Sequence, residues 1–292
     1  MKKTLKKTIA LFLCAVLLAC GSFTIAFAED EKPFYLVLGD SIGYGSGLKN
    51  SREACYGKIV ADTNGYDYAN DAIPGHTTQN LLNRLNEEGV AGHIKQADII
   101  SITIGGNNFL LGNIAKVLFD VIVMDDTASA EKIIDGFYAD FCKIIEKIRS
   151  LNPDAVILMQ TLYNPQTKYI GEAYQTAIDL LNNAIKRYAS EHKGEIEIVD
   201  VASALTDSEK DFAADRIHPS VAGNEKIAVK VLEKLVELGL GKTAEPVITT
   251  PGIDIELPAS FSGGMAFFGE ILHFLAGVRS AFMSILGVFN FA

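Results

Sequence analysis

Short aliphatic runs alternate with segments of helical periodicity through most of this 292-residue chain, and this alternation constrains the fold more than any other feature. Candidate strands recur at five places: 34–38, 66–69, 97–104, 155–161 and 196–201. Candidate helices lie between and after them: 55–63, 77–88, 130–149, 173–191 and 221–238. Such alternation is typical of βαβ units. We therefore predict an α/β fold in three layers, with a central parallel sheet between helices.

The first 28 residues have the organisation of a signal peptide. Four lysines between Lys2 and Lys7 precede a short apolar run, and Ala26-Phe27-Ala28 provides a small-x-small cleavage site. The apolar run is shorter than the roughly 20 residues of a membrane span. We expect a secreted protein that begins at Glu29 after cleavage. The alternative is a lipoprotein anchored through Cys20, which is less favoured because Leu18 stands where such signals usually carry a small residue.

Charge and cysteine content narrow the classes of partner. The formal net charge is −10 although the leader contributes four lysines, so the remainder is strongly acidic and nucleic acid is not an expected partner. Outside the leader only Cys55 and Cys142 remain, which allows either one disulfide or two half-buried thiols. No Cys/His cluster has metal-ligand spacing, and we expect neither a metal nor a cofactor.

The pattern of strands and helices ends near residue 241, which predicts a single domain over 29–241. Residues 242–264 are rich in Thr, Pro, Gly and Ser and predict a linker. In 265–292 apolar residues recur every three or four positions from Phe268 to Phe289, which predicts an amphipathic helix. Such a helix can lie on a membrane surface, dock on a partner, or pack back onto its own domain.

One serine and one histidine have the context of catalytic groups. Ser41 follows the first predicted strand in Gly39-Asp40-Ser41, and a serine hydroxyl needs a base to become a nucleophile. His218 lies between the last strand and the last helix, and Asp215 precedes it by three residues. That spacing allows the carboxylate to bond Nδ1 and leaves Nε2 free to face Ser41. Four other histidines have no comparable carboxylate and are expected at the solvated surface: His76, His93, His192 and His273.

Four short blocks in this order resemble the motifs of the SGNH (GDSL-type) hydrolases: Gly39-Asp40-Ser41, Asn70 to Gly75, Gly105-Gly106-Asn107 and Asp215-x-x-His218. The resemblance implies a flavodoxin-like α/β/α fold and an ester hydrolase with the triad Ser41, Asp215 and His218. It also implies an oxyanion hole formed by the backbone N–H groups of Ser41 and Gly75 and the side-chain amide of Asn107. Two positions depart from the family pattern. Asn108 replaces an aspartate, so we expect the contacts that hold the Asn107 side chain in place to differ from those of the family. Ile42 replaces a leucine.

Other functions remain open at this stage. Gly39 to Gly43 also fits the G-x-S-x-G elbow of α/β-hydrolases, but that elbow normally follows several strands. The same triad can transfer the acyl group to an alcohol, and a catalytically silent cell-surface binding module would keep the fold alone. The apolar segment 109–124 is either a lid or acyl pocket or an ordinary core helix. With the C-terminal stripe it favours lipid-like or lysophospholipid esters over acetylated carbohydrate. Three tyrosines can replace the missing tryptophan as a sugar platform: Tyr44, Tyr163 and Tyr169.

Overall fold

The computed structural model describes residues 32–111, 114–165, 171–256, 271, 274–278 and 280. The chain divides into two compact units, Met1–Lys32 and Pro33–Ala292, and the fold below is that of the second unit. The predicted signal peptide lies outside the described residues.

The second unit is built on five parallel strands: β1 (Phe34–Gly39), β2 (Asp67–Asn70), β3 (Ile99–Thr103), β4 (Val156–Gln160) and β5 (Glu197–Val199). They are ordered β2-β1-β3-β4-β5, so the chain moves outward from β1 in one direction and then in the other. The carboxyl ends of β1 and β3 therefore form the switch point where ligands of open α/β sheets bind. The predicted parallel sheet is confirmed.

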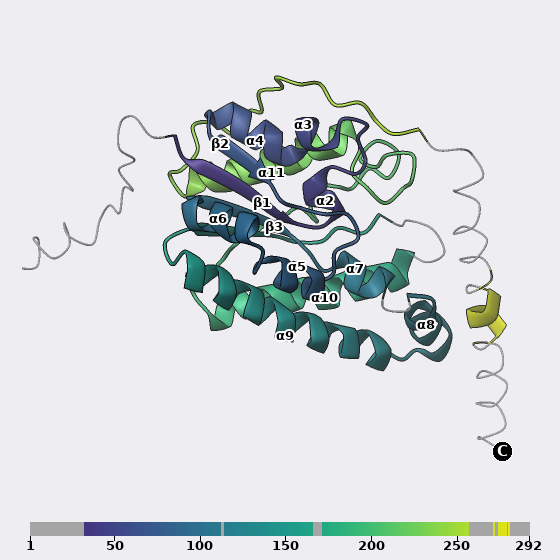
Figure 1. Cartoon of the computed structure of the whole chain (residues 1–292). Helices are drawn as coiled ribbons and strands as arrows, with labels where there is room; N and C mark the ends of the chain where they lie inside the picture. The colour runs from purple at the N-terminus through teal and green to yellow at the C-terminus, as the bar shows by residue number, and fades with distance from the viewer. Residues whose placement is uncertain are drawn as a thin grey trace, which may run out of the picture. The chain divides into compact units, whose positions relative to one another are not determined.

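Helices cover both faces of the sheet, as Figure 1 shows. One face is covered by α4 (Tyr56–Asn64) and α11 (Val221–Glu237). The other face is covered by four helices: α5 (Thr78–Arg84), α6 (Glu88–Gln96), α9 (Ala128–Leu151) and α10 (Gly171–Glu191). Short helices occupy the connections after β1 and β3: α2 (Ser41–Tyr44), α3 (Ser51–Ala54), α7 (Gly106–Leu110) and α8 (Ile114–Phe119), with a π-helical turn η1 (Asp120–Met124).

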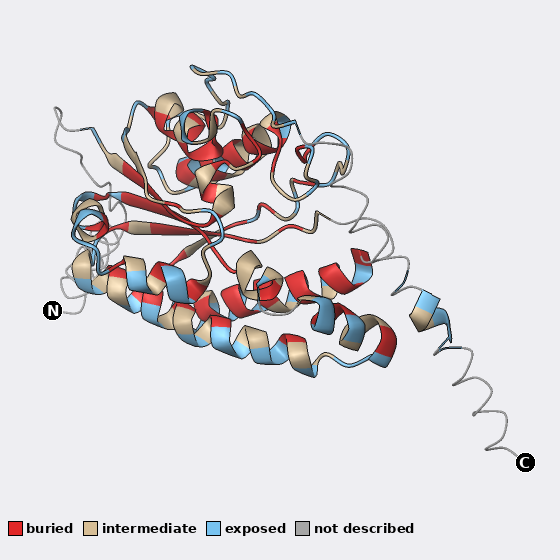
Figure 2. Cartoon of the chain, turned by 45° about the vertical axis from the view of Figure 1, so that its right-hand side comes forward, coloured by how far each residue is buried: buried red, intermediate tan, exposed pale blue. Residues whose placement is uncertain are grey.

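The central strands are apolar on both faces because each face meets a helical layer. In β1, Leu36 and Leu38 join the core under α9 and α10, whereas Tyr35 and Val37 join the core under α4 and α11. Figure 2 shows the central strands buried, while the helices alternate buried inner faces with exposed outer ones. The three-layer α/β/α prediction is confirmed, and its cores fix the strand ends that carry the site.

Two predicted helices have other boundaries in the structure. The segment 77–88 forms α5 and the start of α6, and the chain breaks between them at Leu85–Glu87. The amide of Asn86 donates to the carbonyls of Leu82 and Asn83, so it competes with continued helix. The segment 109–124 spans α7, α8 and η1 and is not one helix.

The described part of the predicted linker lies along the domain. Residues 242–256 form no helix and no named strand, but Lys49 N donates to Ile253 O at 2.7 Å and Ile255 N to Gly47 O at 3.0 Å. Of the predicted tail helix 265–292, residues 274–278 are helical and described, and Leu275 packs against the cluster of Leu118 and Tyr174. Residues 271 and 280 are also helical, and the remaining residues of that prediction lie outside the described part of the chain.

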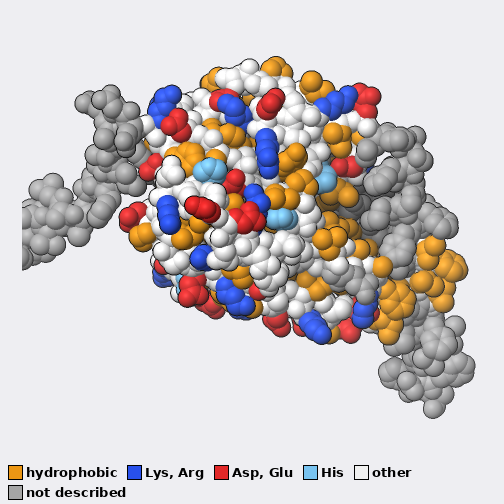
Figure 3. All heavy atoms as spheres, in the orientation of Figure 1, with side chains coloured by type: hydrophobic (Ala, Val, Ile, Leu, Met, Phe, Trp, Pro, Cys, Tyr) orange, Lys and Arg blue, Asp and Glu red, His pale blue; other side chains and the backbone are white. Residues whose placement is uncertain are grey.

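Cys55 and Cys142 are free thiols, so the predicted option of a disulfide between them is excluded. Cys55 precedes α4 and is buried beside the Tyr68 hydroxyl, whereas Cys142 lies on α9 against the opposite face of the sheet. Within the described residues, no helix combines the length and apolar character needed to cross a membrane. Acidic and basic side chains are interspersed on the face seen in Figure 3.

Candidate active site

The turn that carries Ser41 is held against the end of β3. Ser41 opens α2, and the preceding Asp40 caps this helix by accepting a hydrogen bond from Ile42 N at 3.0 Å. Thr103, at the end of β3, donates its hydroxyl to the same carboxyl oxygen at 3.0 Å. Gly39 has φ +125°, and a Cβ there would lie 1.8 Å from the Thr103 carbonyl oxygen. Only glycine allows this close approach, which fixes the direction in which Ser41 leaves the sheet.

Asp40 is a buried carboxyl with a raised pKa, a property that its place in the Gly39-Asp40-Ser41 motif does not indicate. Its side chain is buried, and burial raises its pKa from 3.8 to about 6, while the hydrogen bonds from Ile42 and Thr103 act in the opposite direction. His218 is close enough to favour the charged carboxylate electrostatically. The predicted nucleophile therefore stands beside a buried carboxyl that changes charge in mildly acidic solution.

Asp215 and His218 lie together in a closed loop. Asp215 Oδ2 is 2.6 Å from His218 Nδ1, and its other oxygen accepts the backbone N–H groups of Ile217 and His218 at 3.0 Å each. Burial alone would raise the pKa of Asp215, but these hydrogen bonds hold it below the usual value. The loop is closed by Ala213 N donating to the His218 carbonyl at 2.9 Å. The structure thus brings the predicted Asp–His pair together, with Nδ1 occupied.

Tyr163, one of the tyrosines proposed as a sugar platform, instead holds the loop of Asp215 and His218 in place. The Tyr163 hydroxyl donates to the Ile217 carbonyl at 3.0 Å, and its ring packs on Phe212 with centroids 5.3 Å apart. Asn182 on α10 holds the same connection by bonding both backbone groups of Leu162 at 2.8 Å. Tyr163 is only 9% exposed, and it lines the cavity together with Ser41 and His218. Of the other two tyrosines, Tyr44 lies under the guanidinium of Arg52, and Tyr169 lies outside the described residues.

The three predicted oxyanion donors line one cavity with the triad residues Ser41 and His218. In the described part of the chain, the backbone N–H groups of Ser41 and Gly75 donate no hydrogen bond. Gly75 has φ +81°, a conformation that a side chain would strain. The Asn107 amide donates one N–H to the His76 carbonyl at 3.0 Å, which holds the side chain and leaves its second N–H available. The N–H groups of Ser41 and Gly75 and the second N–H of Asn107 therefore have no hydrogen-bond partner among the described residues.

Asn108, which replaces the aspartate of the family pattern, still supports the segment that carries Asn107. Its side-chain oxygen accepts the Thr78 N–H at 3.1 Å, and its amide donates to the Thr78 hydroxyl at 2.9 Å. The Thr78 hydroxyl in turn lies 3.3 Å from Asp140 on α9. An amide suits this place because it accepts and donates at once, which a carboxylate cannot do. Asn108 thus ties α7, which carries Asn107, to the start of α5.

The cavity is about 330 Å³, and apolar side chains form most of its wall. Phe109, Leu110 and Ile114 come from the segment that sequence analysis offered as either an acyl pocket or a core helix. The segment both lines the cavity and enters the main core, to which Phe109 and Val117 belong, while Leu111 is 68% exposed; its role as an acyl pocket stays a prediction. Across the cavity the wall is completed from the β4 connection and α10 by Leu162, Tyr174, Ala177 and Ile178.

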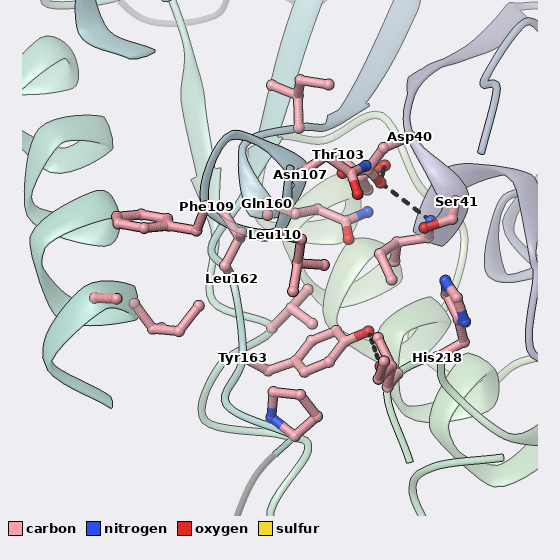
Figure 4. Close-up of a pocket in the computed structure, with 18 of the residues that line it drawn as sticks. Asp40, Ser41, Thr103, Asn107, Phe109, Leu110, Gln160, Leu162, Tyr163 and His218 are labelled. Atoms are coloured by element: carbon pink, nitrogen blue, oxygen red, sulfur yellow. Dashed lines mark hydrogen bonds between the residues drawn. The ribbon is translucent and has the colours of Figure 1, made fainter. Parts of the chain in front are cut away.

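Figure 4 shows Ser41 and His218 on the same side of this cavity, from α2 and the loop before α11. No hydrogen bond joins the Ser41 hydroxyl to the imidazole among the described residues. Such bonds are often long before substrate binds and tighten in the reacting complex. The arrangement has the groups needed for acyl transfer: a hydroxyl, a base with its orienting carboxylate, and donors for an oxyanion.

The His93 side chain is 42% exposed, as expected of a surface histidine, but it and His76 have further features. His93 Nδ1 lies 2.8 Å from Asp71 Oδ2, so it does have a carboxylate partner, one distant in sequence. His76 has a buried Nδ1 without a described partner, and burial followed by the charge of Arg84 lowers its pKa. His192 stacks on Tyr188 with centroids 4.3 Å apart, and His273 lies outside the described residues.

Comparison with known proteins agrees with this geometry. Residues 37–226 match the model of the GDSL-like Lipase/Acylhydrolase family. The chain is 30% identical to the uncharacterized protein YpmR of Bacillus subtilis, over 60% of this chain and 69% of that protein. It is 28% identical to the spore germination lipase LipC of Bacillus licheniformis, over 71% of this chain and 97% of that protein. A lipase from a goat rumen metagenome, Lip_vut3, shares the fold with a TM-score of 0.59 and 24% identity, over 72% of this chain and 99% of that one. The chain belongs to the GDSL-like lipase/acylhydrolase family.

Proposed function

We propose that this protein is a serine esterase that hydrolyses lipid-like carboxylic esters through an acyl-enzyme on Ser41. The observation that carries the proposal is the apolar cavity at the predicted nucleophile, which Ser41, Gly75, Asn107 and His218 all line. A pocket of about 330 Å³ is of the size that holds small ligands, and its apolar wall suits the acyl chain of an ester better than a polar sugar.

The proposed reaction uses the residues as follows. His218 Nε2 takes the proton of Ser41 while Oγ forms a bond to the ester carbonyl carbon. The N–H groups of Ser41, Gly75 and Asn107 bind the resulting oxyanion. His218 then gives its proton to the leaving alcohol as the C–O bond breaks. A water molecule repeats the cycle on the acyl-enzyme and releases the acid, while Asp215 stabilises the imidazolium that forms twice.

The choice of lipid-like esters over acetylated carbohydrate has two supports. The wall formed by Phe109, Leu110 and Ile114 is apolar along its length, and Tyr163 is buried against the catalytic loop. The names of LipC and Lip_vut3 describe lipases, and this is carried over here as part of the proposal. Lysophospholipid-like substrates are included because a single acyl chain matches a single cavity.

We also propose that the protein is secreted, on the strength of the predicted leader over residues 1–28. The sequence of the protein recovered from the culture medium should then begin at Glu29. A chain that stays with the cells and carries lipid at Cys20 would show the lipoprotein alternative instead.

The test of the function is hydrolysis of p-nitrophenyl esters from acetyl to long-chain acyl by the secreted protein and by Ser41→Ala. We expect cleavage by the wild type, loss in the variant, and an optimum at acyl chains longer than acetyl. An added alcohol as acceptor measures transferase activity in the same assay. If the wild type cleaves no ester and a fluorophosphonate probe leaves Ser41 unlabelled, the proposal fails and a silent binding module is the better interpretation.

A further inference from the structure

Gln160 places a buried amide at the floor of the cavity, and the proposed mechanism does not use it. It is the last residue of β4, is 3% exposed, and lines the same cavity as Ser41. Among the described residues its side chain makes one hydrogen bond, from Nε2 to Ser101 Oγ at 3.3 Å. A primary amide has two donor hydrogens and two acceptor lone pairs, so most of this capacity is left for a ligand.

The amide is held from behind by a buried polar pair. The Ser101 hydroxyl lies 3.2 Å from the Tyr56 hydroxyl, and both residues are fully buried. Tyr56 is fixed in turn because its backbone N–H donates to Asn224 on α11 at 3.1 Å. Leaving a buried amide unpaired is costly. An anchored amide with a free end in an apolar cavity therefore has the character of a binding group.

The order of the strands determines which part of a substrate meets this amide. Ser41 follows β1 and Asn107 follows β3, so the ester carbonyl lies over these two strands. Leu162 follows β4 and α10 leads on to β5, so an acyl chain that runs from Ser41 toward this part of the wall passes the end of β4. Neighbouring strands are about 4.8 Å apart, so the end of β4 is about 10 Å from that of β1. Figure 4 shows the amide of Gln160 extending from β4 back toward Ser41, which places it beside the first carbons of the chain.

We propose that Gln160 is a substrate-binding residue that selects acyl groups carrying a hydroxyl close to the ester carbonyl. A hydroxyl both donates and accepts, so it can satisfy the free amide end, whereas a plain alkanoyl chain leaves that end unpaired. The inference rests on the proposed esterase function and adds a polar requirement to its otherwise apolar acyl pocket.

The experiment compares ethyl butanoate with each enantiomer of ethyl 3-hydroxybutanoate by pH-stat, for the wild type and Gln160→Met. Methionine keeps the length of the side chain and removes the amide. We expect the wild type to show a kcat/KM about threefold or more higher for one hydroxy ester. We expect Gln160→Met to lower the ratio of hydroxy to plain ester by about three- to tenfold, the effect of one neutral hydrogen bond. Gln96→Met, on the exposed side of α6, is the control and should keep the wild-type ratio.

The ratio of the kcat/KM values for two substrates on one protein is insensitive to partial unfolding, because unfolding lowers both values by the same factor. Equal ratios in the wild type and Gln160→Met would overturn the inference, and so would a wild type that prefers ethyl butanoate over both hydroxy esters. The second result needs no variant, so the test stands even if Gln160→Met fails to fold. Failure of the proposed function looks different, because the wild type would then hydrolyse none of the three esters.

Discussion

Replacing Asp40 by asparagine should change how the stability of this protein depends on pH. The carboxyl is buried, and its pKa is raised to about 6 in the folded chain against an ordinary value of 3.8. The gap between these pKa values corresponds to about 3 kcal/mol of unfolding free energy. Asparagine can keep the oxygen that accepts from Ile42 and Thr103, and it carries no charge at any pH in the assay.

The direction follows from proton binding. The folded state holds the Asp40 proton more tightly than the unfolded state, so this group favours folding below about pH 4. That contribution is lost as pH rises through about 6, because a buried charge must then form. Asp40→Asn has no carboxyl at this position, so it does not lose this stability as pH rises. The free energy of unfolding of the variant, relative to the wild type, should therefore rise by about 2–3 kcal/mol between pH 4 and pH 8.

The assay is urea unfolding followed by far-ultraviolet circular dichroism at several pH values from 4 to 8, on the wild type and on Asp40→Asn. Any constant offset from the new amide cancels, because only the change of the difference with pH is compared. Asp135→Asn, on the exposed side of α9, is the matched control and should run parallel to the wild type. Parallel curves for Asp40→Asn as well would refute the reasoning, since the buried carboxyl would then not be titrating.

Two further changes probe the catalytic loop and the oxyanion donors. Asn107→Ala should lower kcat about 10²- to 10³-fold with little change in KM, because the amide acts on the transition state; an unchanged kcat on the best p-nitrophenyl ester would remove Asn107 from the oxyanion hole. Tyr163→Phe removes the hydrogen bond to the Ile217 carbonyl and should cost about 1 kcal/mol of stability and lower kcat. Tyr66→Phe removes a similar bond, to the Leu240 carbonyl, away from the cavity. It should lose stability without loss of kcat, and equal kcat losses in both variants would contradict a positioning role for Tyr163.

The sequence by itself determined the class of fold and the identity of the principal candidates. Alternating periodicities predicted five parallel strands and their helices, because a strand covered on both faces must be apolar throughout. The Asp215–His218 pair was also readable, since a three-residue spacing within one loop fixes its geometry locally. The sequence also places Ser41 and Asn107 at one edge of the sheet, because each directly follows a strand and parallel strands end together.

Only the tertiary structure decided what depends on contacts between distant segments. The Asp71–His93 pair spans 22 residues and Tyr163–Ile217 spans 54, so no local pattern signals either. The raised pKa of Asp40 comes from burial, and burial depends on all the layers that meet around it. Gln160 is one glutamine at the end of a strand in the sequence. It becomes a binding group only because β3 supplies Ser101 behind it and α7 and α10 build an apolar cavity in front of it.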